Sequence, residues 1–356
     1  MINEATKTIY VDYSTKAVFQ ACKEKCRLNS VIGWRTNVAD SKLTYGHAFH
    51  AAIAAYYDAL AGGWFDENRK WHRFDKVADS VQSTTPTTHA KAAFLRDLKI
   101  EGATLPITLE AEDRRSIERG LAMVEAYIAK WRNEPYESIL DKDGVPLTEV
   151  GFTYQLAQYE DYKIVHVGYI DRIMKNIMTH RPVNFETKTT TLGLDSFIEQ
   201  SKPNDQVTGY YIPANKIVWE LGFNKEIVET VWDCAFISKR KPDMNKALTD
   251  RHWMYGVDVE ADFRRHITTR SRSDITEFLF DAEEWAIDYA KWLLSGQKRW
   301  PRSAPTACHM YGGCQFRKRC TLNFDSDEAE NEYMRSFFII KKWEPWKKIL
   351  GLTENE

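Results

Sequence analysis

The chain has 356 residues, 43% of them hydrophobic, so it is long enough to bury a large core as one elaborated domain or as two. Its net charge of -2 excludes a uniformly basic surface, so any nucleic-acid binding must come from local patches. No apolar stretch is long enough to span a membrane and no signal peptide is recognisable. We therefore expect a cytoplasmic protein without a membrane partner.

The first elements are predicted to be helices, and two of them carry a candidate ligand. Residues 15–29 are predicted to form a helix that presents Cys22. A second, apolar helix begins at Gly46 and carries His50 one turn later on the same face. A glycine there lets the helix approach another backbone closely, and imidazole is a competent metal ligand. A lone histidine is more often a core or surface residue, so His50 needs partners to be a ligand.

A long, mostly helical stretch follows, and we interpret residues 51–148 as a helical insertion or lid rather than an independent domain. Its clearest helix ends near Pro135, and its apolar residues follow helical spacing: Ile117, Leu121, Val124, Ile128 and Trp131. This insertion separates the helix of His50 from the strands that come next.

Residues 149–237 are predicted to form a sheet. One strand starts at Glu149, the chain turns near Glu160, and a second strand, rich in β-branched and aromatic residues, ends at Asp171. Glu149 is either an outer residue of a site that contains Asp171 or a solvated residue at the start of a strand.

The most informative local pattern is Glu186-Thr187-Lys188 in the strand that follows. Because side chains alternate along a strand, Glu186 and Lys188 share one face. Two strands then bring the carboxylates of Asp171 and Glu186 and the ammonium of Lys188 to one point. Carboxylates suit Mg²⁺ or Mn²⁺, and a neighbouring lysine can orient a water, which are the needs of metal-assisted phosphodiester hydrolysis. Alone, a Glu-x-Lys pattern is most often a pair of solvated charges.

Three further elements are predicted beyond this strand. Gln206 and Tyr210 occupy positions i and i+4 of a helix, where both can donate hydrogen bonds to a phosphate or a water, although an ordinary polar face is the simpler interpretation. Residues 227–237 are predicted to extend the sheet. A helix is expected to begin near Asp281, with Glu284 completing a capping box.

The cysteines give a second signal. Three of the six, Cys308, Cys314 and Cys320, lie in one glycine-containing segment within residues 301–325. In a reducing compartment metal ligation is favoured over disulfides, and a four-cysteine site needs one more thiolate. Cys234 lies in an apolar run and is predicted to be a buried core thiol.

The order Gly-x-x-x-His, Gly-x-x-Asp, Glu-x-Lys and Gln-x-x-x-Tyr resembles the PD-(D/E)XK nuclease superfamily, and within it the RecB-like exonuclease branch, although Ile170 stands where the superfamily name has proline. The resemblance implies an α/β (α+β), restriction-endonuclease-like fold with a central mixed sheet flanked by helices. It implies four metal ligands: His50, Asp171, Glu186 and the backbone carbonyl of Thr187. It also implies a catalytic lysine that acts on the attacking water, with an accessory helical motif: Lys188, Gln206 and Tyr210.

The cysteine pattern resembles one subgroup of these nucleases, which includes AddB and the iron–sulfur nuclease of CRISPR adaptation. Their single N-terminal and three C-terminal cysteines hold a 4Fe–4S cluster that clasps the ends of the domain. This implies that Cys22 joins the three C-terminal cysteines, with Cys26 as the alternative fourth ligand. The Tyr-Gly-Gly-Cys-x-Phe pattern at 311–316 is similar to bacteriophage versions, which would act in the bacterial host cytoplasm. A structural zinc, with His309 able to replace one thiolate, is the alternative to the cluster.

The sequence thus predicts a single nuclease domain over residues 1–325, in which the sheet is catalytic. It would be an Mg²⁺- or Mn²⁺-dependent exonuclease acting on DNA that is single-stranded or has free ends. Because no ATP-binding phosphate loop is present, a separate helicase or recombination protein would open long duplexes. An oligomer is compatible with this interpretation. The alternative is a non-catalytic DNA-binding or assembly subunit of a recombination or repair complex.

Residues 326–356 are predicted to be a tail helix that docks on the core, and their interleaved basic and aromatic residues would also suit a partner or DNA contact. Four basic patches are candidate phosphate contacts, although such a patch is more often just a solvated face. They are Lys239–Lys241, Arg264 with Arg265, Arg270 with Arg272, and Arg317–Arg319.

Overall fold

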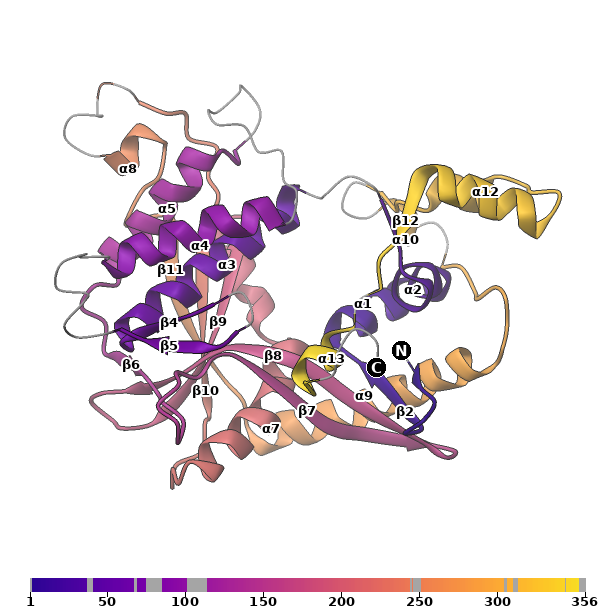
Figure 1. The fold of residues 1–356 in the computed structure, drawn as a ribbon, viewed down its shortest axis with the longest axis horizontal. Coiled ribbons are helices and arrows are strands. Elements are labelled where there is room, and N and C mark those ends of the chain that lie inside the picture. Colours follow the sequence, from indigo (N-terminus) through magenta and orange to yellow (C-terminus); the bar gives the residue numbers. More distant parts are fainter. Residues whose placement is uncertain are drawn as a thin grey trace. The chain divides into compact units, whose positions relative to one another are not determined.

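A computed structural model (Figure 1) describes residues 2–36, 41–66, 69–74, 85–100, 114–243, 245, 251–303, 306–309, 313–342 and 344–351. Helix accounts for 46% and strand for 25%, and a central mixed sheet is flanked by helices, so the predicted mixed α/β class is confirmed. The chain divides into two compact units. Unit 1 comprises residues 1–38, 151–169 and 273–356, and unit 2 comprises residues 39–150 and 170–272.

Unit 2 is built on a mixed sheet in the order β8–β9–β10–β11. β9 runs antiparallel to β8 and parallel to β10, β11 is antiparallel to β10, and β6 pairs with the end of β8. β7 leads from unit 2 into unit 1, and β8 leads back. The bounds are β6 (Tyr136–Ser138), β7 (Thr148–Tyr159), β8 (Tyr162–Asn176), β9 (Pro182–Thr190), β10 (Glu229–Phe236) and β11 (Phe263–Thr269). The predicted strand at 227–237 is therefore confirmed as β10.

Helices cover both faces of the unit 2 sheet. Residues of α3, α4 and α5 share the main hydrophobic core with Phe185 and Phe263 of the sheet. Leu194 of α6 packs on the opposite face, against Trp232 and Cys234. Since side chains alternate along a strand, Phe185 and Glu186 face different layers. The bounds are α3 (Ser41–Leu60), α4 (Pro86–Ile100), α5 (Ile117–Lys130), α6 (Leu194–Ile198), the 3₁₀ helix η2 (Glu199–Ser201), α7 (Asp205–Glu220) and α8 (Arg251–Met254).

The predicted insertion at 51–148 contains both helices and strands. Its clearest predicted helix is confirmed as α5, which begins after Ser116, whose hydroxyl accepts the Arg119 N–H at 3.1 Å. A hairpin of β4 (Gly63–Phe65) and β5 (Trp71–Arg73) directly follows α3. The insertion is therefore not purely helical, and all of it belongs to unit 2.

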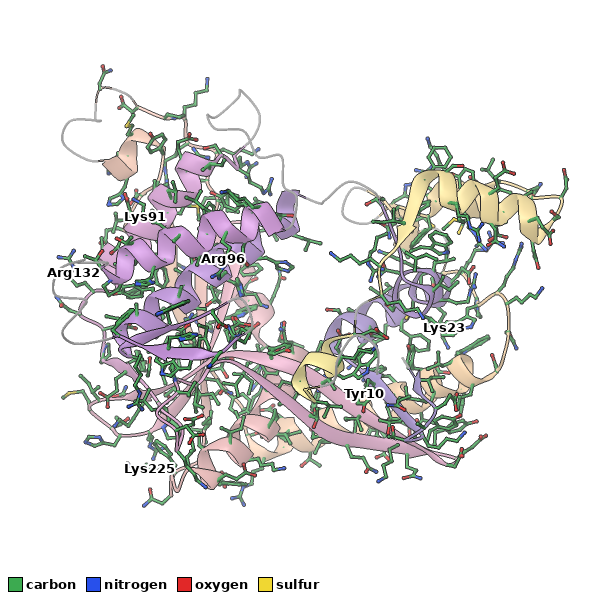
Figure 2. The ribbon with its side chains drawn as sticks, in the orientation of Figure 1. Tyr10, Lys23, Lys91, Arg96, Arg132 and Lys225 are labelled. Carbon is green, nitrogen blue, oxygen red and sulfur yellow. The ribbon has the colours of Figure 1, made fainter. Side chains whose placement is uncertain are left out.

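Unit 1 contains both ends of the chain. β2 pairs with β1 and runs parallel to β8. Tyr10 of β2, labelled in Figure 2, stacks on Trp346 of α13, and the ring centroids lie 5.1 Å apart. The predicted tail is one helix, but the described residues between 326 and 351 contain two helices with the strand β12 between them, and the second of these helices packs on β2 through Trp346. The bounds are β1 (Ile2–Asn3), β2 (Thr8–Val11), α1 (Tyr13–Ala21), α2 (Lys23–Cys26), the π-helix η1 (Arg27–Ile32), β3 (Trp34–Thr36), α9 (Arg272–Leu294), α10 (Thr306–His309), α11 (Arg317–Thr321), α12 (Asp327–Phe337), β12 (Phe338–Ile340) and α13 (Pro345–Ile349).

Two further predicted helices differ from the structure. The helix expected over residues 15–29 is interrupted at Cys22, which is extended (φ -163°, ψ 115°), and the N–H of Glu24 donates to the distant carbonyl of Pro301 at 3.0 Å instead of to the preceding helical turn. The helix expected to begin near Asp281 begins at Arg272 instead. The buried spacing of Phe278, Ala282 and Trp285 continues through the supposed cap, so the capping-box pattern lies inside a helix.

Candidate metal centre

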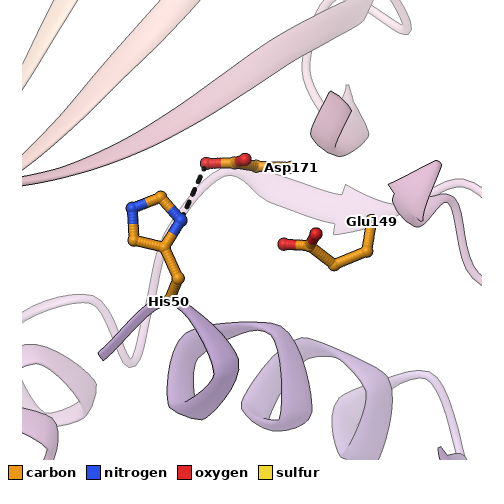
Figure 3. A group of neighbouring side chains, drawn as sticks. All are labelled: His50, Glu149 and Asp171. Atoms are coloured by element: carbon orange, nitrogen blue, oxygen red, sulfur yellow. Dashed lines mark ion pairs between the residues drawn. The ribbon is translucent and has the colours of Figure 1, made fainter. Parts of the chain in front are cut away.

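The helix α3 brings His50 to the end of the sheet because it can approach β9 closely. A Cβ placed on Gly46 would lie 3.1 Å from Thr189 Oγ1, so a larger residue would push the helix away. His50 follows one turn later, and its Nδ1 lies 3.5 Å from Asp171 Oδ2 (Figure 3). Its side chain is 25% exposed, so a ligand can reach it.

Asp171 lies where β8 and β9 separate. The antiparallel pairing runs from Lys175 opposite Pro182 to Arg172 opposite Phe185. Asp171 directly precedes Arg172, where the backbone pairing stops. There the side chain of Asp171 replaces a backbone acceptor, since its Oδ2 accepts the Thr187 N–H at 2.7 Å. This hydrogen bond fixes the carboxylate and leaves its other oxygen for a different partner.

Glu149 is the third member of this cluster. The nearest ligand atoms of His50, Glu149 and Asp171 all lie within 4.8 Å of one another, and Figure 3 shows the three side chains converging. Glu149 has a left-handed backbone (φ 51°), which is strained for a residue with a side chain. The Arg69 guanidinium holds this backbone, donating to the carbonyl of Thr148 at 3.1 Å and that of Glu149 at 3.5 Å.

Glu186 and Lys188 form the adjoining part of the site. The Lys188 ammonium lies 2.5 Å from Glu186 Oε1 and donates to Gln206 Oε1 at 3.1 Å. Gln206 in turn donates to the Tyr210 hydroxyl at 2.8 Å, across one turn of α7. The two helix residues therefore hold the lysine in place beside a carboxylate.

The electrostatics of the site favour a bound cation. Burial raises the pKa of Glu149 to about 8 and that of Glu186 to about 7, and the charge of Asp171 adds to both shifts. Burial lowers the pKa of His50 to about 4, against the charge of Asp171, so the imidazole is neutral at pH 7 and has a lone pair to share. Burial alone would lower the pKa of Lys188, but the charges of Glu186 and Asp171 raise it, so the ammonium persists.

These donors fit a divalent cation. Three carboxylates and one imidazole are ligands that Mg²⁺ and Mn²⁺ accept. Glu186 is 1% exposed, and its Oε2 has no hydrogen-bond partner among the described residues, which is costly for a buried carboxylate oxygen without a ligand. A divalent ion would supply that partner and reverse the pKa shifts of the two glutamates.

The predicted site residues thus lie in unit 2 as two sets, and the members of each set lie close to one another. His50 and Asp171 form one set, which Glu149 joins, and the other contains Glu186, Lys188, Gln206 and Tyr210. Glu186 is not part of the 4.8 Å group, where sequence reasoning expected it as a ligand beside His50 and Asp171.

Sequence reasoning overlooked the two charged residues behind the site, Arg172 and Asp233. Arg172 Nη2 lies 2.9 Å from Asp233 Oδ2, and both side chains are at most 3% exposed. The available signal was a carboxylate in the apolar run 231–237, because a charge in a buried strand needs a charged partner.

The cysteines lie in unit 1. Cys22 is buried between α1 and α2, and Cys308, Cys314 and Cys320 are partly exposed. The N–H of Cys314 donates to the carbonyl of Cys308 at 3.0 Å, while residues 310–312, with much of the predicted Tyr-Gly-Gly pattern, lie outside the described residues. The segments that carry Cys22 and Cys314 are joined, since Phe316 packs in one core cluster with Leu28 and Trp34.

The other thiols are less suited to ligation. Cys26 is fully buried, and burial raises its pKa to about 12, which disfavours the thiolate. Cys234 is fully buried in the unit 2 core, as predicted.

Zn–S bonds of about 2.3 Å would bring two thiolates of one zinc ion within about 4.6 Å of each other. Within the described ranges, His50–Glu149–Asp171 is the one group of three potential ligands that meets a 4.8 Å limit, so the thiols as they stand do not form a single-zinc site.

Several arginines of the predicted basic patches are structural. Arg265 pairs with Asp233 and Glu134, Arg270 donates to the Ser201 carbonyl at 2.6 Å, and Arg319 pairs with Glu24 at 2.7 Å. These three side chains are buried, so phosphate contacts would have to come from other cations. Buried arginines need partners, and the sequence alone did not separate them from surface ones.

No family model and no curated protein matches the chain. Among the helices of the described residues, none has the length and apolar character needed to cross a membrane.

Proposed function

We propose that this protein is a metal-dependent deoxyribonuclease of the RecB-like PD-(D/E)XK type. The observation that carries the proposal is the convergence of His50, Glu149 and Asp171 within 4.8 Å, beside a buried Glu186–Lys188 pair. These groups match what metal-assisted hydrolysis of a phosphodiester needs: hard ligands for a divalent ion and a cation next to the reacting water. The separation of β8 and β9 at Asp171 suits the restriction-endonuclease-like core that the proposal implies.

The residues divide into three roles in this proposal. His50, Asp171 and Glu186 hold Mg²⁺ or Mn²⁺ together with the Thr187 carbonyl, and Glu149 contributes a further carboxylate. The ion supplies Lewis-acid stabilisation of the developing charge. Lys188 orients the attacking water and is itself held by Gln206, which is positioned by Tyr210. The substrate is DNA that is single-stranded or has free ends, and a separate helicase or recombination protein would supply it from long duplexes.

The proposal is tested by cleavage of end-labelled single- and double-stranded DNA with Mg²⁺, Mn²⁺ or EDTA. Lys188→Met removes the ammonium at similar volume and should abolish cutting. Lys216→Met is the matched control, because Lys216 lies on α7 with a side chain that is 72% exposed. Metal-dependent cutting by the wild type and the control, lost in Lys188→Met, supports the nuclease. Folded, DNA-binding protein that never cuts would favour the assembly subunit instead.

We further propose that Cys22, Cys308, Cys314 and Cys320 hold a 4Fe–4S cluster that clasps the two ends of the chain. Support comes from the packing of the segments that carry Cys22 and Cys314 in unit 1 and from the presence of four cysteines, the usual ligands of such a cluster, in that unit. Anaerobically purified protein should be brown and contain iron. Cys314→Ser should lose colour and iron, whereas Cys234→Ser, which changes a core thiol, should keep both. Colourless wild-type protein containing zinc would overturn the cluster.

A further inference from the structure

Behind the candidate metal site lies a buried network of charges that the proposed reaction does not use. Arg172 donates to Asp233 at 2.9 Å, and Asp233 also contacts Arg265 at 3.3 Å. Arg265 in turn pairs with Glu134, and the hydroxyls of two tyrosines complete the network: Tyr57 and Tyr127. None of the four charged side chains is more than 8% exposed.

Stability alone does not account for this network. Its two arginines and two carboxylates balance in charge, yet removing four ions from water is costly, and well-packed apolar residues often stabilise a core equally well. A role in fixing the relative positions of the elements that it joins explains a buried ion network better than a gain in stability does. The network joins α3, α5, β8, β10 and β11, so it links a helix of the site to most of the sheet.

Thr187 connects this network to the site. Its side chain is buried, and its hydroxyl accepts a hydrogen bond from Arg172 Nη1 at 3.0 Å. Its backbone N–H donates to Asp171 Oδ2 at 2.7 Å. Arg172 itself is held by Asp233 and lies 4.6 Å from the centroid of the Tyr57 ring. Thr187 is therefore hydrogen-bonded to the network through its side chain and to the Asp171 carboxylate through its backbone N–H.

We infer that Thr187 and Arg172 are positioning residues, which transmit the rigidity of the buried network to the Asp171 carboxylate and so preorganise the metal site. This inference rests on the proposed metal site. The partners that orient a metal ligand commonly control affinity almost as strongly as the ligand itself, with losses of about 10- to 100-fold on mutation. The Thr187 backbone is also held in the parallel β9–β10 ladder, opposite Asp233, so losing the Arg172 contact would remove one restraint on Thr187 and hold the Asp171 carboxylate less firmly.

The test compares two substitutions of Thr187 by Mn²⁺ titration calorimetry. Thr187→Val keeps the shape but removes the hydroxyl, so we expect Mn²⁺ affinity to fall about tenfold. Thr187→Ser keeps the hydroxyl and should bind Mn²⁺ like the wild type. Thr230→Val is the matched control on β10, since Thr230 is 2% exposed and its hydroxyl has no partner among the described residues. It should leave Mn²⁺ affinity unchanged.

A purely structural role of the hydroxyl predicts a different result. In that case Thr187→Val lowers the unfolding temperature but binds Mn²⁺ as tightly as the wild type, and the inference fails. It fails as well when the wild type binds no Mn²⁺. Should Thr187→Val not fold, Arg172→Lys keeps the charge but loses the fork that reaches both Thr187 and Asp233, and it must show the same loss. Because the readout is binding, a protein that binds Mn²⁺ but cuts no DNA would overturn the nuclease and not this inference.

Discussion

Each unit buries a glutamate that is 1% exposed, and the two glutamates are in opposite electrostatic situations. Glu24 in unit 1 is fully satisfied: it accepts from Arg27 at 2.7 and 2.9 Å, from Arg319 at 2.7 Å and from the Trp300 N–H at 2.9 Å. Glu186 in unit 2 has the Lys188 ammonium on one oxygen, an unpartnered second oxygen among the described residues, and other carboxylates nearby.

The pKa shifts express the same contrast. Burial would raise the pKa of Glu24, but Arg27, the Trp300 N–H and Arg319 outweigh it and lower the pKa below its usual value. Burial and the charge of Asp171 raise the pKa of Glu186 to about 7. A buried carboxylate with every acceptor satisfied holds the fold together, whereas one short of donors is prepared for a ligand. The same substitution, Glu→Gln, should therefore have opposite effects at the two positions.

Glu24→Gln should give the largest effect, a loss of about 3 kcal/mol in the free energy of unfolding. The charge-assisted hydrogen bonds from Arg27 and Arg319 would weaken, and both arginines would stay buried. Urea unfolding at pH 7 measures the loss, with Glu328→Gln on the exposed side of α12 as the control. Because the folded pKa of Glu24 is lowered, its contribution is present above about pH 4.5 and is lost as the pH falls through the folded pKa. A variant as stable as the wild type would remove the structural half of the contrast.

Glu186→Gln should instead stabilise the metal-free protein, by about 1–3 kcal/mol at pH 8, because it removes a charge that the site disfavours. The same variant should lose the stabilisation by Mn²⁺, which reaches about 2.7 kcal/mol in the wild type at 100 times Kd. Thermal unfolding with and without Mn²⁺ measures both. Glu220→Gln, on a side chain that is 65% exposed, should change neither. Destabilisation of the metal-free variant would mean that Glu186 is as structural as Glu24.

A histidine in unit 1 allows a smaller test with pH. His166 is 1% exposed, packs against the rings of Tyr13, Phe152 and Tyr154, and has no hydrogen-bond partner for either nitrogen among the described residues. Burial, with the charge of Lys16, lowers its pKa to about 3.

Since the unfolded chain binds this proton near pH 6.5, stability is present above that pH and is lost as the pH falls toward 3. At pH 5 the cost is about 2 kcal/mol. His166→Phe should therefore gain about 2 kcal/mol over the wild type between pH 8 and pH 5, by urea unfolding. His180→Asn, at an exposed left-handed position that Asn tolerates, should show no such gain. An equal pH profile in His166→Phe would place the acid sensitivity elsewhere.

Local rules account for the features that the sequence predicted well. Strand alternation places Glu186 beside Lys188, and helical spacing places Gln206 beside Tyr210, because both depend on residues a few positions apart. The same kind of rule failed at Asp281, where a cap-like pattern lies inside α9.

The remaining features depend on tertiary contacts. Glu149 joins His50 and Asp171 through a left-handed backbone held by Arg69, 80 residues away in the chain. Nothing in the local sequence of Glu149 separated it from a solvated residue at a strand start. The hydrogen bond from Arg172 to the Thr187 hydroxyl likewise depends on the register of β8 and β9, which the alternation of side chains along a strand does not predict.

Gly46→Ala should have the smallest effect, and it tests how closely α3 must approach the sheet. Alanine favours a helix over glycine by about 1 kcal/mol, but its Cβ would lie 3.1 Å from Thr189 Oγ1, so the gain and the crowding nearly cancel in stability. His50 is one turn away on the same helix, so a shift of α3 would instead weaken Mn²⁺ binding by a few-fold. Adding Thr189→Ala removes the crowded atom and should restore the affinity. If the single variant binds Mn²⁺ as the wild type does, the site tolerates the shift and its rigidity comes from the sheet alone.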